Sequence, residues 1–279
     1  MPDPSPLIST HDLAARLGAQ DLRIVDASWH LDGRDGRPDF VAARLPGAVF
    51  FDLEASSDSS GDLPHMLPSP EAFAARMGAL GLSEADHIVV YDTLGLRSAP
   101  RVWWMLKVMG ARRAQVLDGG LPAWREAGLP LDSGPAPEPR PAVFHAGFDA
   151  DRVASMDDVR HALEAGEQVL DARPAARFRG EATEPRPGLR CGHMPGARNL
   201  PFPEVVDAAG RLKAPGELRA AFASAGIDPD RPVITTCGSG VTAAILGLGL
   251  AALGRSFRLY DGSWAEWGAP DGGPVAIGA

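Results

Sequence analysis

A cysteine lies where an apolar strand gives way to a glycine-rich turn, close to the C-terminus. The segment reads Pro232-Val-Ile-Thr-Thr-Cys237-Gly-Ser-Gly-Val-Thr-Ala243, and the small apolar residues that follow predict a helix over 243–253. The unpaired N–H groups and the dipole at the start of a helix stabilise an anion. A thiol at this place should therefore ionise more readily than a free one. We predict that Cys237 is a nucleophile.

The glycines beside this cysteine support the prediction. Gly238 and Gly240 are expected to adopt backbone angles that other residues resist, so that the loop amides turn toward the sulfur. A cysteine can also be no more than a small apolar residue of the core. A core position, however, does not need two nearby glycines, because each costs roughly 0.5–1 kcal/mol in a regular element.

Two other motifs overlap the same segment. Gly238 to Ala243 fits the G-x-G-x-x-A dinucleotide fingerprint, and Asp261 follows at about the distance of an acid that binds ribose. A cysteine phosphatase would have an arginine six residues after the cysteine, where this chain has Ala243. The phosphatase interpretation therefore has little support, and the dinucleotide interpretation depends on the role of Asp261.

An internal repeat bears on that role. Four pairs of motifs correspond, in the same order and at nearly the same offset: Ile24-Val-Asp26-Ala with Val169-Leu-Asp171-Ala, Leu45-Pro-Gly-Ala48 with Met194-Pro-Gly-Ala197, Val89-Val-Tyr-Asp92 with Ile234-Thr-Thr-Cys237, and Leu117-Asp118-Gly-Gly-Leu-Pro-Ala-Trp124 with Tyr260-Asp261-Gly-Ser-Trp-Ala-Glu-Trp267. The chain is therefore two copies of one unit. Asp261 has a twin, Asp118, in a half without the fingerprint, so we expect the Asp-Gly turn to be scaffold. Asp92 stands in the place of Cys237, which predicts one catalytic half and one inactive half.

Strands alternate with helices in both halves, which predicts an α/β fold. We expect two tandem domains, each a mostly parallel sheet flanked by helices. The domains are predicted at 1–132 and 148–279, with a stiff proline-rich linker at 133–147. Ser155 and Asp158 form a capping-box pattern at the start of a helix. The other elements expected are helices at 10–17, 69–78, 99–109 and 215–225, and strands at 168–172, 199–202, 232–236 and 257–260.

Composition limits the class of protein. A chain of 279 residues with 45% apolar residues is long enough for two globular domains. No apolar run approaches the ~20 residues that span a bilayer, and the N-terminus does not resemble a signal peptide. Two cysteines do not make a disulfide framework, so we expect a cytoplasmic protein. The net charge of −9 argues against nucleic-acid binding, and the seven histidines lack metal-ligand spacing, so no metal is expected.

Arginines gather locally against this acidic background. Between residues 171 and 198 three acidic residues are outnumbered by Arg173, Arg177, Arg179, Arg186, Arg190 and Arg198. A run of charges is usually a solvated face. An acidic protein with an anionic substrate nevertheless needs a local positive field, and arginine suits a carboxylate because it can bind it bidentately.

These motifs together resemble the tandem-domain sulfurtransferases of the rhodanese superfamily, over nearly the whole chain. The loop from Cys237 to Ala243 is similar to that of the 3-mercaptopyruvate branch, whereas the thiosulfate branch usually has two basic residues in place of Gly238 and Ser239. The other segments that resemble family motifs are Ser98-Ala-Pro-Arg-Val-Trp-Trp104, Arg177-Phe-Arg-Gly180, Glu184-Pro-Arg-Pro-Gly188, Gly192-His-Met-Pro-Gly-Ala197 and Asp261-Gly-Ser-Trp-Ala-Glu-Trp267.

The resemblance implies a persulfide mechanism without a cofactor. Cys237 would take sulfur from 3-mercaptopyruvate, release pyruvate, and pass the sulfur to a thiol such as reduced thioredoxin, or to cyanide. Arg177 and Arg186 would hold the substrate carboxylate and keto oxygen. The remaining substrate-binding residues implied are Gly238, Gly240, Val241 and Thr242.

The family also suggests a proton relay through Ser239, His65 and Glu54, although some relatives have aspartate where this chain has Glu54. His65 could equally be a structural histidine. Two alternatives to this function stay open: a thiosulfate:cyanide sulfurtransferase and a non-catalytic persulfide carrier or binding module. Cys191 is expected to be a free thiol, with a resolving role as its alternative, and the protein is expected to be a monomer.

Overall fold

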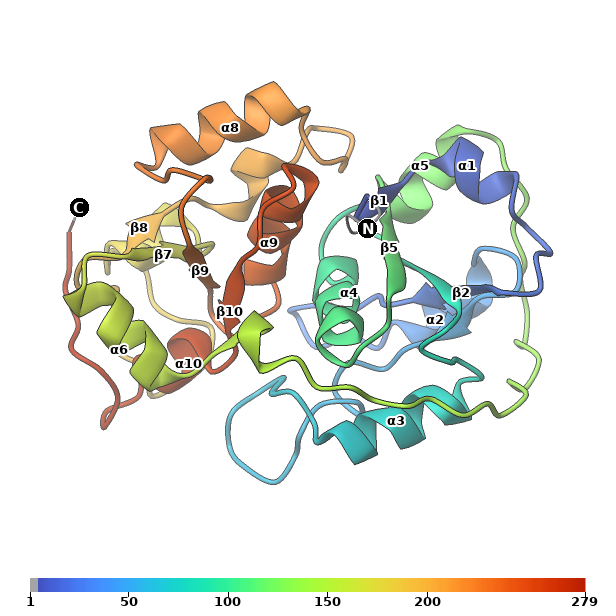
Figure 1. The fold of residues 1–279 in the computed structure, drawn as a ribbon, viewed down its shortest axis with the longest axis horizontal. Helices are drawn as coiled ribbons and strands as arrows, with labels where there is room; N and C mark the ends of the chain where they lie inside the picture. The colour runs from blue at the N-terminus through green and yellow to red at the C-terminus, as the bar shows by residue number, and fades with distance from the viewer. Residues whose placement is uncertain (1–4, 279) are drawn as a thin grey trace. The chain divides into compact units, whose positions relative to one another are not determined.

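The computed structural model describes residues 5–278, which form two compact units (Figure 1). Unit 1 comprises the chain up to Ser57, Pro68–Asp149 and Val206–Leu212. Unit 2 comprises Asp58–Leu67, Ala150–Val205 and the chain from Lys213 onward. Each unit therefore contains one short segment that comes from the other half of the sequence.

Unit 1 is built on a parallel sheet of five strands in the order β1-β5-β4-β2-β3. The strands are β1 (Leu7–Ile8), β2 (Leu22–Asp26), β3 (Val49–Phe50), β4 (His87–Tyr91) and β5 (Arg113–Leu117). The helices are α1 (Thr10–Ala14), α2 (Arg37–Ala42), α3 (Pro70–Ala79), α4 (Ala99–Val108) and α5 (Gly120–Glu126). Every residue of β4 is buried, as expected for a central strand of a parallel sheet with helices packed on it.

Unit 2 repeats this topology, with the strand order β6-β10-β9-β7-β8 and all strands parallel. The strands are β6 (Val153–Ala154), β7 (Gln168–Asp171), β8 (Arg198–Asn199), β9 (Val233–Thr236) and β10 (Arg258–Tyr260). The helices are α6 (Met156–Glu164), α7 (Ala175–Phe178), α8 (Pro215–Ser224), α9 (Ala243–Ala252) and α10 (Ser263–Trp267), with 3-10 turns η1 (Ala150–Arg152) and η2 (Phe202–Val205). The predicted α/β fold and its internal repeat are confirmed.

Strand register places the two halves of the repeat in equivalent positions. Asp26 at the end of β2 pairs with Tyr91, and Asp171 at the end of β7 pairs with Thr236. The next residue along β4 is Asp92, and the next along β9 is Cys237. Both residues therefore lie at the carboxyl edge of a central strand, which is where ligand sites form in parallel sheets.

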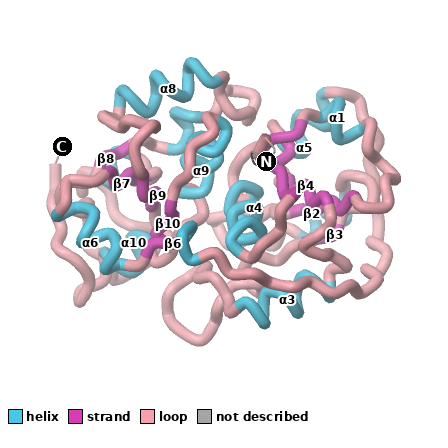
Figure 2. The backbone as a smooth tube through the Cα atoms, viewed as in Figure 1, coloured by secondary structure: helices cyan, strands magenta, loops and turns pink. Residues whose placement is uncertain are grey.

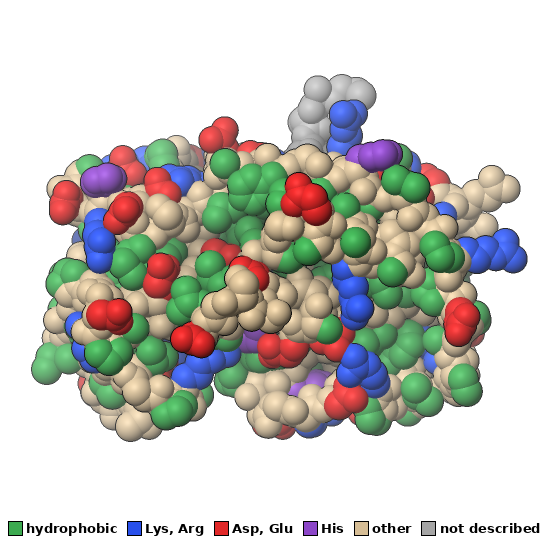
Figure 3. All heavy atoms as spheres, turned by 90° about the horizontal axis from the view of Figure 1, so that it is seen from below, with side chains coloured by type: hydrophobic (Ala, Val, Ile, Leu, Met, Phe, Trp, Pro, Cys, Tyr) green, Lys and Arg blue, Asp and Glu red, His purple; other side chains and the backbone are tan. Residues whose placement is uncertain are grey.

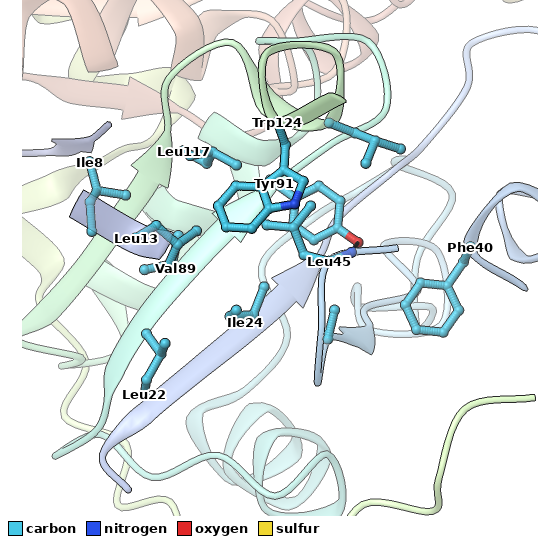
Figure 4. Packing of buried hydrophobic residues seen from close by; sticks show 12 residues of the cluster. Ile8, Leu13, Leu22, Ile24, Phe40, Leu45, Val89, Tyr91, Leu117 and Trp124 are labelled. Carbon is cyan, nitrogen blue, oxygen red and sulfur yellow. Dashed lines mark hydrogen bonds between the residues drawn. The ribbon is translucent and has the colours of Figure 1, made fainter. Parts of the chain in front are cut away.

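The core of unit 1 is drawn in Figure 4, where Tyr91, Trp124, Leu45 and Ile24 lie close together. The hydroxyl of Tyr91 accepts a hydrogen bond from the backbone N–H of Leu45 at 3.2 Å.

The helices that follow β4 and β9, which are α4 and α9, are almost entirely buried, and α9 packs on β9 and β10. Small residues in α9 allow this close packing: a methyl group on Gly247 would collide with the ring of Phe257.

Some predicted boundaries were wrong, for local reasons. The helix expected over 10–17 ends at Ala14, because Arg16 and Leu17 bond three residues back, as in a tighter turn. The strand expected over 199–202 is Arg198–Asn199, and η2 begins at Phe202. Pro201 interrupts the strand because it has no N–H to donate to the ladder. The capping box is present, with Ser155 and Asp158 bonded reciprocally.

The proline-rich segment at 133–147 contains no helix or strand and belongs to the long loops shown in pink in Figure 2. It runs along unit 1, where Ala142 N–H donates to the carbonyl of Gly78 at 2.9 Å and Gly147 N–H to that of Met109 at 3.0 Å.

On the face drawn in Figure 3, acidic and basic side chains are interspersed. Among residues 5–278, no helix combines the length and apolar character needed to cross a bilayer.

Candidate active site

Cys237 lies in the loop between β9 and α9 of unit 2 and is 2% exposed. The start of α10 holds this loop in place. The carbonyl of Cys237 accepts a hydrogen bond from Trp264 N–H, and that of Gly238 accepts one from Ala265 N–H, both at 2.9 Å. The thiol is therefore held in a buried loop that leads from the end of β9 to the N-terminus of α9, as the sequence predicted.

The two glycines of the loop serve different purposes. Gly240 has a φ of +77°, a conformation that residues with a side chain rarely adopt. Gly238 has an ordinary φ, so the expectation that both glycines are needed for backbone angles was wrong for Gly238. Its reason is space, because a Cβ atom there would lie 3.1 Å from Nη2 of Arg177. Gly238 lets a guanidinium approach the residue next to the thiol.

Arg177 belongs to the short helix α7 and is held by an acidic partner. Its Nε donates to Oε2 of Glu184 at 3.1 Å, and its Nη2 pairs with the same oxygen. The Glu184 side chain is 1% exposed, whereas that of Arg177 is 17% exposed. Within the described part of the chain, Nη1 of Arg177 donates no hydrogen bond. One edge of the guanidinium is thus occupied, and the other remains able to bind an anion.

Most other arginines of this region have structural partners. Arg173 is buried and paired with Asp171, Arg179 pairs with exposed Glu181, and Arg190 donates to three backbone carbonyls. Arg186 is half-buried. Three arginines of the predicted cluster are therefore engaged in internal contacts. Arg177 and Arg186 stay the candidates that the family resemblance implies for substrate binding.

His65 belongs to unit 2, although it comes from the first half of the sequence. It is 2% exposed and has a φ of +61°, which is unusual for a residue other than glycine. Its Nδ1 lies 3.0 Å from the hydroxyl oxygen of Ser239. Two residues later, Leu67 N–H donates to Oδ2 of Asp261 at 2.7 Å. The structure therefore brings together two of the three predicted relay residues.

Glu54, the third relay residue, lies in unit 1. Its Oε1 accepts a hydrogen bond from the indole N–H of Trp29 at 2.8 Å. It lines a cavity of about 350 Å³, together with His30, Arg34 and Arg37. Glu54 is thus placed at the carboxyl edge of the sheet of unit 1, near the end of β3.

The remaining predicted residues have few side-chain interactions that bear on a function. Val241 is buried, and Thr242 is the residue that precedes α9, with no side-chain cap bond. Cys191 is half-buried, and both cysteines are free thiols. The described residues contain no group of three or more His, Cys, Asp or Glu side chains arranged to hold a metal ion.

Asp92, the twin of Cys237, shows what the corresponding loop does in unit 1. Its carboxylate accepts hydrogen bonds from four backbone N–H groups, at 2.8–3.0 Å: those of Leu94, Arg97, Ser98 and Ala99. Burial raises the pKa of Asp92, and these bonds act in the opposite direction. The loop of unit 1 therefore surrounds a side-chain carboxylate of its own, that of Asp92.

Two residues around the site were not among the predicted site residues. In the sequence, Glu184 belongs to a segment that resembles a family motif, and the repeat predicts a scaffold role for Asp261. The sequence does hold a signal for Glu184, because this carboxylate lies between the two candidate arginines Arg177 and Arg186. The sequence around Asp261 gives no local signal of its contact, because its partner Leu67 is 194 residues away.

Known proteins resemble this chain over most of its length. A model described as a rhodanese-like domain matches residues 9–127 and again 155–270. The 3-mercaptopyruvate sulfurtransferase of Escherichia coli (strain K12) is 46% identical over 268 residues, covering 94% of this chain and 95% of that protein. The mitochondrial thiosulfate/3-mercaptopyruvate sulfurtransferase 1 of Arabidopsis thaliana is 40% identical over 294 residues, covering 97% of this chain and 78% of that protein.

A solved structure extends this likeness to three dimensions. The crystal structure of SseA from Escherichia coli, reported for the rhodanese fold and catalytic mechanism of 3-mercaptopyruvate sulfotransferases, is similar with a TM-score of 0.86. The identity is 42%, and the match covers 94% of this chain and 99% of that one. The chain belongs to the rhodanese-like family and carries two copies of its domain.

Proposed function

We propose that this protein is a sulfurtransferase that moves sulfur from 3-mercaptopyruvate to a thiol acceptor through a persulfide on Cys237. The observation that carries the proposal is a buried thiol, Cys237, whose neighbour Gly238 lies against the guanidinium of Arg177. Only one edge of that guanidinium is bound to Glu184. A nucleophile whose next residue lies against a guanidinium suits a small α-keto acid that bears sulfur. The names of the relatives support the same substrate.

The first half-reaction forms one bond and breaks one. The thiolate of Cys237 attacks the substrate sulfur, and the bond between that sulfur and the methylene carbon breaks with its electron pair going to carbon. The products are a cysteine persulfide and the enolate of pyruvate, which takes up one proton. Arg177 and Arg186 would bind the carboxylate and the keto oxygen, where negative charge develops as the enolate forms.

The hydroxyl of Ser239 and the imidazole of His65 are the proposed source of that proton. Their separation of 3.0 Å is within hydrogen-bond reach, and both groups are buried, so bulk water does not compete with the transfer. The part of Glu54 in this relay stays a prediction. In the second half-reaction an acceptor thiolate attacks the outer sulfur and returns Cys237 to its thiolate form.

The alternative donor is thiosulfate, because the Arabidopsis relative carries both names. Thiosulfate is a dianion, and the loop residues Gly238 and Ser239 add no positive charge. Mercaptopyruvate carries one carboxylate and a polarised keto group, which two arginines can bind. The charges beside Cys237 therefore favour mercaptopyruvate. The cytoplasmic location, the monomeric state and a thioredoxin-like acceptor stay predictions.

One assay tests the proposal. Initial rates of pyruvate release from mercaptopyruvate are measured with a dithiol acceptor, beside thiocyanate formation from thiosulfate and cyanide. We expect a much higher kcat/KM for mercaptopyruvate. A higher value for thiosulfate would favour the alternative donor, and the absence of both activities would favour a non-catalytic persulfide carrier.

A further inference from the structure

We propose that Glu184 is a positioning residue for the substrate site, acting through Arg177. This inference rests on the proposed role of Arg177 as a substrate-binding group. Glu184 lies within a row of four charged side chains, in which its two oxygens have different partners. Oε1 accepts from Nη1 of Arg173 at 2.8 Å, and Oε2 accepts from Nε and Nη2 of Arg177.

The row consists of Asp171, Arg173, Glu184 and Arg177, in that order, and its inner end is rigid because Asp171 belongs to β7. Arg173 is 1% exposed and donates to both oxygens of Asp171, the last residue of β7, at 2.7–3.2 Å. It also donates to the carbonyl of Gly192 at 2.9 Å and lies 4.1 Å from the ring centre of Trp264. A buried guanidinium with this many partners has one conformation. Glu184 is therefore bound to a fixed group on its inner side.

The outer end of the row is the less buried one. Arg177 is the third of the four residues of α7, a single helical turn, and arginine loses much rotamer freedom when it is held. Glu184 binds the Nε and Nη2 edge, which keeps Nη2 above Gly238. Nη1 is left for the substrate. Without Glu184 the same charge would be present, but its direction would not be set before substrate binds.

The experiment compares Glu184→Gln with the wild-type full-length protein in steady-state kinetics with mercaptopyruvate. The amide keeps the shape of the side chain, and Arg173 keeps Asp171 as its partner, so folding should survive. We expect KM to rise by about tenfold, the size of one lost charge-assisted hydrogen bond, with kcat changing much less. Glu184→Asp, which keeps the charge but shortens the reach, serves as a second variant and should also raise KM.

Glu181→Gln is the matched control. Glu181 lies in the same loop and pairs with Arg179, but both side chains are exposed, and neither contacts the site. Its KM and kcat should equal those of wild type. If Glu184 were only structural, its variants would lower Tm and kcat while KM stayed at the wild-type value. That result, or a lower KM caused by removing a competing negative charge, would overturn the inference.

A double-mutant cycle separates this inference from the proposed function. In an Arg177→Gly background, Glu184→Gln should change KM no further, because the group that it positions is gone. If Arg177→Gly alone leaves KM unchanged, the assignment of Arg177 to the substrate fails. If Arg177→Gly raises KM but Glu184→Gln does not, only the role of Glu184 fails.

Discussion

The carboxylate of Asp261 accepts a hydrogen bond from Leu67 N–H at 2.7 Å, across 194 positions of the sequence. Its twin in the repeat, Asp118, accepts one from Leu212 N–H at 2.9 Å. In both units the aspartate of the Asp-Gly turn therefore holds a segment that comes from the other half of the chain. The repeat carries this binding feature as well as the fold.

This pair of contacts gives a prediction with an internal control. Asp261→Ala should lower kcat with mercaptopyruvate, because it releases the segment that places His65 beside Ser239. Asp118→Ala should leave kcat unchanged. Each variant should lose about 1.5–3 kcal/mol of unfolding free energy, the range for a hydrogen bond to a charged group. Equal losses of kcat in the two variants would show that the contact acts only through stability. Steady-state kinetics and urea unfolding measure both quantities.

The role of the thiol is tested by changing the two cysteines separately. Cys237→Ser should abolish sulfur transfer, because a hydroxyl cannot form a persulfide. Cys191→Ser should keep wild-type rates, since Cys191 lies outside the loop. Mass spectrometry after exposure to mercaptopyruvate should find one added sulfur atom in the peptide that contains Cys237. Substantial turnover by Cys237→Ser would contradict the mechanism.

Donor choice should respond to charge in the loop. Gly238→Arg adds a cation and should raise the ratio of kcat/KM for thiosulfate to that for mercaptopyruvate by about tenfold, since specificity is a difference in transition-state binding. Gly238→Ala is the control for size alone, because its Cβ would lie 3.1 Å from Arg177 Nη2 without adding charge. It should lower kcat/KM for both donors and leave their ratio unchanged. A similar shift in the alanine variant would assign the effect to space.

Asp26 should make the stability depend on pH. Burial raises its pKa to about 6 from the usual 3.8, and bonds from Ser28 act in the opposite direction. Between these values the folded protein binds more protons than the unfolded chain, so this group lowers stability as pH rises from about 4 to 6. Asp26→Asn removes that loss, and its advantage over wild type should grow by up to about 3 kcal/mol between pH 4 and 7.5.

Urea unfolding of wild type and Asp26→Asn at the two pH values measures this effect. Asp171→Asn is the contrast, because Asp171 is the twin of Asp26 but pairs with buried Arg173. That variant should lose stability at pH 7.5, since it leaves a buried cation with one partner fewer. An advantage of Asp26→Asn that did not change with pH would show that the carboxyl group does not titrate in this range.

The sequence predicted those parts of the structure that depend on local pattern. The apolar strand, the glycine-rich turn and the small-residue helix around Cys237 predicted a strand, a loop and a helix in that order. The internal repeat predicted that the other half of the chain forms the same kind of sheet. The contacts of Glu184 could not be predicted, because they depend on which side chains become buried together. The partner of Asp261 could not be predicted either, since no local pattern assigns Asp58–Leu67 to unit 2. The purpose of Gly238 required knowledge of a distant guanidinium.

The exchange of short segments also decides how this chain can be divided. A cut in the proline-rich stretch would give an N-terminal fragment that carries Asp58–Leu67 but lacks Val206–Leu212, and a C-terminal fragment with the opposite deficit. Cys237 and both candidate arginines would be in the second fragment, and His65 would be in the first. A gene that encoded only the cysteine-bearing half would therefore encode an incomplete domain. The two halves, although copies of one unit, each supply a segment that belongs to the other unit, so neither unit is complete without the whole chain.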